Sequence, residues 1–261
     1  MPATMDQFIT ETPEHQPSLF SADWASRADR FPTRATAHVP TQAAGRAYAP
    51  RTGRLFSLGQ RGLLKGDHPR RRGPAAGRAY VAGVALPPGS SVSRLSQVWD
   101  RVTVTIGELD LRDPQPVLHV VEHYRWPLGA VDAGFHGIER QLAADWNCRR
   151  IVVGEPSTTG RSKTRGAVEL LSLAPGSKSR LALGLLQTAS AARIKMYASD
   201  GSQEQQEFWA QAVKAQARYG PDGSLDFFVE HSTGGDGFLL SLALVTEAAR
   251  ALRSPEAKAA A

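Results

Sequence analysis

His119 and His123 are the first side chains in this 261-residue chain whose type and spacing could do chemistry. They lie four residues apart within 116–126 (PVLHVVEHYRW), a segment that we predict to be a strand. Side chains alternate along a strand, so the two imidazoles are expected on one face and Glu122 on the other. Such a pair could bind a metal ion, although a half-exposed strand face accounts for it more simply. Cys148 is the only cysteine, which excludes an intramolecular disulfide and a cysteine-based zinc site.

Acidic residues stand at the ends of predicted elements. Glu155 follows the apolar run 150–154 (RIVVG), and strand ends commonly carry ligands in α/β sheets. Asp236 opens an apolar helix expected over 237–252, where the helix dipole favours an acidic residue in any case. Asp100 follows Trp99 just before a predicted strand, a position equally suited to the end of a turn. Each of these residues therefore has a structural interpretation beside a functional one.

Phosphate-binding motifs are absent from the sequence, apart from one basic helix start. The segment 154–164 (GEPSTTGRSKT) departs from a phosphate loop, because five residues separate its glycines and Arg161 stands where lysine is required. No glycine-rich dinucleotide fingerprint follows a strand, which argues against an oxidoreductase. Lys178 precedes an apolar helix, with Ser177 available as its cap. It could contact a phosphate there or simply be solvated.

The order of the predicted elements indicates the fold class. Three strands, expected over 79–86, 102–109 and 116–126, form a hairpin-linked trio, and a helix over 135–147 leads into an apolar strand over 150–154. Helices are expected over 165–173, 178–189, 202–219 and 237–252, with an edge strand over 193–197 and a further strand over 225–230. This order predicts an α/β protein with a mixed sheet flanked by helices. A ribonuclease-H-like core begins in this way.

Composition and charge divide the chain into regions. Hydrophobic residues make up 41% and charged residues 21%, as in globular proteins, and no apolar run is long enough to span a membrane. The formal net charge is +6, and residues 1–75 hold 11 Lys and Arg against 6 Asp and Glu. We expect a basic, largely irregular and loosely ordered arm and linker over 1–75, in which 53–65 could form one short helix. A folded domain is expected over 76–253 and an alanine-rich tail over 254–261. A basic arm suits a polyanion, but a solvated tail would look the same.

Several segments together resemble the C-terminal nuclease domain of the tailed-phage terminase large subunit, the motor protein that packages and cuts DNA. They are GDHPRRR (66–72), RAYVAGV (78–84), WDRVTVTIGELD (99–110), VVEHYRW (120–126), RIVVG (150–154), SKSRLALGLL (177–186), RIKMYASDGS (193–202) and GGDGFLLSLAL (234–244). The resemblance implies a ribonuclease-H-like fold and cleavage of double-stranded DNA by two ions of Mg²⁺ or Mn²⁺ held by carboxylates. It also implies phage packaging proteins as partners and a prophage gene expressed in the cytoplasm of a bacterial host. The ATPase half of the family is not represented.

The sequence departs from the family pattern at the acidic positions that matter most. Ala85, Gly154 and Gly237 stand where the resemblance leads us to expect acidic residues, whereas Asp236 and Asp100 remain in register. The remaining candidates are Asp236, Glu155 and Asp100 for catalysis, Asp236 and Glu155 for metal binding, and Lys178, Arg70, Arg71 and Arg72 for nucleic acid. Three hypotheses follow: a homologue with impaired catalysis, an active nuclease with a rearranged carboxylate set, and a DNA- or partner-binding module.

Overall fold

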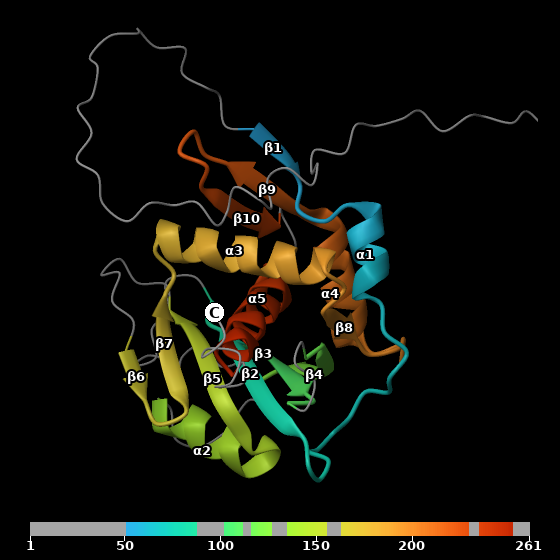
Figure 1. Cartoon of the computed structure of the whole chain (residues 1–261), viewed down its shortest axis with the longest axis vertical. Helices are drawn as coiled ribbons and strands as arrows, with labels where there is room; N and C mark the ends of the chain where they lie inside the picture. The colour runs from blue at the N-terminus through green and yellow to red at the C-terminus, as the bar shows by residue number, and fades with distance from the viewer. Residues whose placement is uncertain are drawn as a thin grey trace, which may run out of the picture. The chain divides into compact units, whose positions relative to one another are not determined.

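The structure, a computed structural model, describes residues 51–87, 102–111, 116–126, 135–155, 163–229 and 235–252. Its centre is a seven-stranded sheet in the order β6-β7-β5-β2-β3-β4-β8 (Figure 1). The strands are β2 (Ala79–Ala85), β3 (Thr103–Leu109), β4 (Leu118–Arg125), β5 (Cys148–Glu155), β6 (Lys163–Arg165), β7 (Val168–Ser172) and β8 (Ile194–Met196).

The strand order confirms the predicted fold class. β2, β3 and β4 form an antiparallel meander, β5 is parallel to β2, and β7 is parallel to β5. The meander with parallel strands added beside its first strand is the arrangement of a ribonuclease-H-like sheet. β8 lies at the edge, parallel to β4, as the alternating pattern of 193–197 predicts.

Helices cover both faces of this sheet. α3 (Pro175–Ser190) and α5 (Gly237–Ala251) lie on one face, together with α4 (Gln203–Lys214), and α2 (Phe135–Trp146) packs against β5 on the other (Figure 1). β2 and β3 are buried along their whole length because both faces are covered. α5 approaches β2 so closely that a Cβ at Gly83 would lie 2.2 Å from the carbonyl oxygen of Ser241. Glycine is therefore required where this helix crosses the sheet.

Two of the helix predictions were wrong. The segment 165–173 forms the β6–β7 hairpin, whose turn holds Gly166 at φ +58°. The helix expected over 202–219 ends at Lys214, and β9 (Ala215–Tyr219) continues from it. Ala215 and Tyr219 fit a helical stripe with Phe208 and Ala212, but Ala215, Ala217 and Tyr219 also alternate as in a strand. Pairing with strands on both sides decided in favour of the strand.

Residues 51–75 differ from the irregular arm expected over 1–75. β1 (Arg51–Arg54) pairs with β9, which pairs in turn with β10 (Leu225–Val229) in a second, three-stranded sheet. α1 (Leu58–Leu64) follows, with Ser57 forming a capping box with Gln60. Leu55, Phe56 and Leu64 are buried in the main core. The folded part therefore includes residues 51–75. No helix in the described ranges is long and apolar enough to cross a membrane.

Candidate functional site

The three positions that lack the expected acidic residues converge in the structure. Ala85, at the end of β2, is paired with Gly154 on β5 and with Thr103 on β3. Gly237 begins α5 directly above, since a Cβ there would lie 2.7 Å from Thr103 Oγ1. The carboxyl ends of β2 and β5 and the start of α5 thus form one locus, which we call the strand-end locus. It consists of Ala85, Thr103, Gly154 and Gly237.

The strand-end locus is lined by apolar side chains. Ala85 is only 2% exposed and belongs to the main hydrophobic core. A Cβ at Gly154 would lie 2.8 Å from Leu244 Cδ1 and 3.3 Å from Leu173 Cδ1, so leucine side chains fill the space of a longer residue. The hydroxyl of Thr103 is buried without a hydrogen-bond partner. These residues do not fit a pair of divalent ions, which need several converging carboxylates.

The remaining acidic candidates do not join into a metal cluster in the described part of the chain. Asp236 occupies the N-cap position of α5, as predicted, but its side chain makes no capping hydrogen bond. Glu155 ends β5, and alternation along the strand directs it to the face opposite Gly154. Within the described ranges, no group of three or more His, Cys, Asp or Glu side chains is arranged to hold a metal ion. Asp100 lies outside the described residues.

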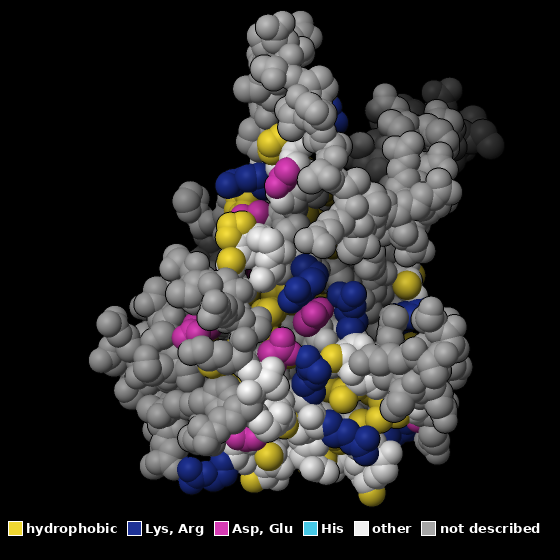
Figure 2. Space-filling model, turned by 60° about the vertical axis from the view of Figure 1, so that its left-hand side comes forward, with side chains coloured by type: hydrophobic (Ala, Val, Ile, Leu, Met, Phe, Trp, Pro, Cys, Tyr) yellow, Lys and Arg dark blue, Asp and Glu magenta, His cyan; other side chains and the backbone are white. Residues whose placement is uncertain are grey.

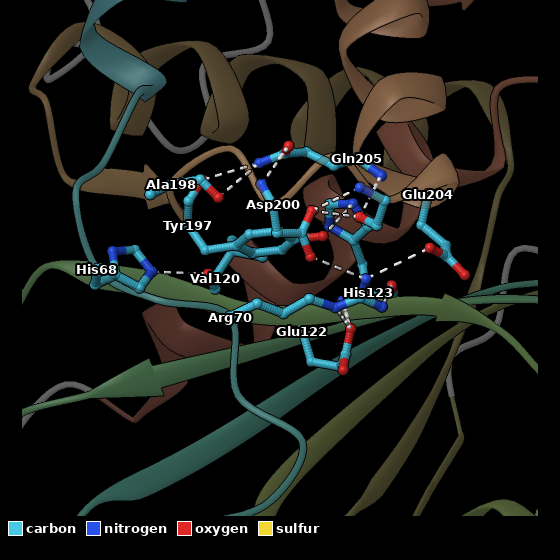
Figure 3. A network of polar contacts seen from close by, with 11 residues as sticks. His68, Arg70, Val120, Glu122, His123, Tyr197, Ala198, Asp200, Glu204 and Gln205 are labelled. Carbon is cyan, nitrogen blue, oxygen red and sulfur yellow. Dashed lines mark hydrogen bonds and ion pairs between the residues drawn. The ribbon is translucent and has the colours of Figure 1, made fainter.

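Arg70 is engaged by carboxylates of the protein itself. Its guanidinium lies 2.6 Å from Glu122, 3.2 Å from Asp200 and 3.4 Å from Glu204 (Figure 3). It also donates to the backbone oxygen of His123. Burial raises the pKa of Glu122, and the charge of Arg70 opposes this shift. Arg70 thus ties the 66–72 segment to β4 and to the start of α4.

The other predicted nucleic-acid contacts fall into two groups. Arg71 pairs with the buried Glu108 at 2.7 Å, whereas Arg72 is exposed. Lys178 pairs with Asp226 at 2.7 Å and lies over the ring of Phe227. It sits in the first turn of α3, which begins at Pro175 with Ala174 as N-cap, so Ser177 lies within the helix and is not its cap. Of the four predicted contacts, Arg72 has the exposed side chain.

The positive charge lies in the folded segment and not in the residues before it. Residues 1–50 hold four Arg against five Asp and Glu, a net −1, whereas residues 51–75 hold seven Lys and Arg against one Asp, a net +6. On the face drawn in Figure 2, Lys and Arg side chains alternate with Asp and Glu. Exposed cations within 51–75 include Arg51, Arg54, Lys65 and Arg72.

A β-bulge separates the two histidines that the sequence places on one face. Gly107 is opposite Val120 and Ile106 is opposite Glu122, so β4 contains one extra residue. His123 is buried against Phe208 and Phe238, beneath α4 and α5. His119 instead contacts His68, which comes from the 66–72 segment. Strand periodicity alone could not reveal the bulge.

The chain resembles solved structures but no family model or curated sequence. No protein-family model matches it, and no curated protein is significantly similar in sequence. Among solved structures, it is similar to the large terminase nuclease of the thermophilic phage G20c with bound magnesium, at 12% identity over 74% of this chain and 96% of that one, with a TM-score of 0.47. The large terminase nuclease domain of Thermus phage P74-26 is 14% identical over 74% and 94% of the two chains, with a TM-score of 0.47. The large terminase of bacteriophage HK97 is 11% identical over 76% and 44%, with a TM-score of 0.46.

Proposed function

We propose that this chain is a homologue of the terminase large-subunit nuclease domain that retains the scaffold and has lost two-metal DNA cleavage. The apolar strand-end locus is the observation that carries the proposal. The segments that resemble the family include strands and a helix that bound this locus: RAYVAGV (78–84) covers most of β2, RIVVG (150–154) lies within β5, and GGDGFLLSLAL (234–244) includes the start of α5.

The chemistry of phosphodiester cleavage explains why this locus matters. Two metal ions clamp the attacking and leaving oxygens, and converging carboxylates must offset the repulsion between the ions. Loss of one such ligand removes orders of magnitude in rate, because the charge that develops on the phosphate is no longer stabilised. Here Ala85, Gly154 and Gly237 supply no carboxylate, and leucine side chains occupy the space beside Gly154. Turnover by this route is therefore not expected.

The competing hypothesis is an active nuclease that uses Asp100, Glu155 and Asp236. Asp236 favours the active-nuclease hypothesis, because it is the N-cap residue of α5 next to the strand-end locus and its carboxylate makes no capping hydrogen bond. The two hypotheses predict opposite results for the purified full chain: no metal-dependent DNA cutting if catalysis is lost, and cutting if the chain is an active nuclease.

A plasmid-nicking assay in Mg²⁺ and in Mn²⁺ separates them. We expect no cutting above the protein-free control, and no change in Asp236→Asn. Asp145→Asn, an exposed residue near the end of α2, is the matched control because it removes the same charge just before the start of β5, whereas Gly154 lies near the end of that strand. Metal-dependent cutting that Asp236→Asn abolishes and Asp145→Asn preserves would overturn the loss of catalysis.

The proposal includes double-stranded DNA as the binding partner, with phage packaging proteins as further partners in the cytoplasm of a bacterial host. Exposed Arg51 and Arg54 on β1 support DNA binding, because exposed cations exchange condensed counterions of the duplex. Arg70, Arg71 and Lys178 support it less, since each is paired with a carboxylate. DNA contact is thus assigned to the exposed cations of 51–75.

A further inference from the structure

His68 and His119 face each other through their Nδ1 atoms. The two nitrogens are 3.4 Å apart, and the rings meet at 83° with their centroids 4.8 Å apart. The contact has the geometry of a weak N–H···N hydrogen bond, and it is longer than the roughly 2.7–3.2 Å that N–H···O bonds measure between heavy atoms. Each residue comes from a different segment: His68 from 66–72 and His119 from β4.

The separation of the two nitrogens matches one edge of a metal coordination tetrahedron. Zinc binds imidazole nitrogen at about 2.0–2.1 Å, and two such bonds at a tetrahedral angle place the nitrogens about 3.4 Å apart. A borderline divalent ion can therefore be accommodated between the two rings with little movement of the nitrogens. Carboxylate-binding ions such as Mg²⁺ are not suited to this pair of ligands.

Hydrogen bonding already prepares His68 as a ligand. Its Nε2 lies 2.8 Å from the backbone oxygen of Val120, which can only accept, so Nε2 carries the proton (Figure 3). In the neutral ring the lone pair is then on Nδ1, the atom that faces His119. A backbone carbonyl in this role is the usual outer partner of a metal-binding histidine.

His68 and His119 are both half-buried, so neither ring is sealed from solvent. Charged groups of both signs act on His119, namely Arg78, Glu108 and Asp67.

The backbone near His68 leaves room for the ring only because residue 66 is glycine. A Cβ at Gly66 would lie 2.9 Å from His68 Nδ1 and 2.3 Å from the backbone oxygen of Met196. The backbone oxygen of His68 accepts from the N–H of Ala198, which holds the segment beside the end of β8. The position of the His68 ring is thus set by the fold and not by the side chain alone.

We propose that His68 and His119 form a two-histidine site for a divalent transition-metal ion of the zinc class, with water molecules completing its coordination. The bound ion would tie the 66–72 segment to β4. The site is separate from the strand-end locus, and it stands whether or not the chain cleaves DNA.

Zinc titration of the full chain, freed of metal with a chelator, tests the site by calorimetry. We expect one ion per chain at this site, and a loss of affinity of about tenfold or more in His68→Gln and in His119→Gln, because each variant removes one of two protein ligands. His231, a histidine outside the described residues and far along the chain from both ligands, provides the control, and His231→Gln should leave binding unchanged. Substitution with Co²⁺ should give the visible absorption of a tetrahedral nitrogen site in the parent chain, and His68→Gln should remove it.

Folding of the variants must be separated from loss of the ligand. His68 is half-buried, and we expect His68→Gln to give the same circular dichroism spectrum as the parent chain. Zinc binding by this variant therefore tests the proposal even if His119→Gln fails to fold. Zinc affinity that is the same in the parent chain and in folded His68→Gln would overturn the proposal, as would a parent chain that binds no Zn²⁺.

Discussion

Gly154 occupies a position where the resemblance to terminase nuclease domains leads us to expect an aspartate. The packing around Gly154 leaves no room for an aspartate side chain. Leu244 and Leu173 approach from α5 and from the end of β7. An added carboxylate would have to move both leucines and would be buried without a partner, and each effect is unfavourable. At the scale of single residues, this locus is therefore an apolar contact and not an empty carboxylate site.

Replacing Gly154 tests this interpretation. We expect Gly154→Asp to lower the free energy of unfolding by about 2 kcal/mol or more, because it adds overpacking to the burial of a charge. Gly154→Ala should cost less, since its methyl group meets only the movable side-chain ends of Leu244 and Leu173. Urea denaturation followed by circular dichroism measures both. Equal midpoints for Gly154→Asp and the parent chain would show that the space can open to solvent.

Single elements differ from expectation where tertiary contacts compete with local pattern. Ala215 and Tyr219 continue the helical stripe of α4, and yet they belong to β9, which pairs with two strands. β4 carries a bulge that places His119 and His123 on opposite faces of the strand. α1 lies within 53–65, where the sequence allows a short helix in an otherwise irregular arm, and its packing places Leu64 in the main core. The boundary of the folded domain therefore lies before α1.

Two leucines of α1 provide a matched test of this boundary. Leu64 is fully buried, so Leu64→Ala should cost about 2–4 kcal/mol through lost burial and the cavity left behind. Leu58, on the same helix, is 79% exposed, and Leu58→Ala should change stability by less than about 0.5 kcal/mol. Thermal unfolding of the two variants compares them directly. If α1 were a detached arm, both substitutions would have equally small effects.

The charge of the whole molecule is distributed differently from what a count over 1–75 suggests. The net +6 of residues 51–75 belongs to a folded segment, and residues 1–50 are slightly acidic. Part of that positive charge is neutralised within the protein, by Glu122 around Arg70 and by Glu108 around Arg71. DNA affinity should depend on the exposed cations that remain.

The salt dependence of DNA binding tests this distribution. Removing residues 1–50 should leave the slope of log affinity against log salt unchanged, whereas the double variant Arg51→Ala with Arg54→Ala should reduce it by about 1.8, at about 0.9 per phosphate contact. Arg149→Ala, an exposed residue of β5, is the control and should leave the slope unchanged. Fluorescence anisotropy with a short duplex at several salt concentrations gives the slopes. If removal of residues 1–50 reduced the slope and the Arg51→Ala, Arg54→Ala variant did not, the DNA contacts would lie in the first 50 residues instead.

The sequence by itself determined the fold class, most strand positions and the three missing acidic residues. Those features depend on local properties: apolar runs that form buried strands, turn residues between them and the identity of single side chains. Only the tertiary structure decided that Ala85, Gly154 and Gly237 meet, that leucines fill the space beside them, and that His119 faces His68 and not His123. Register, bulges and packing between distant segments arise from contacts across the chain, and a local pattern does not contain them.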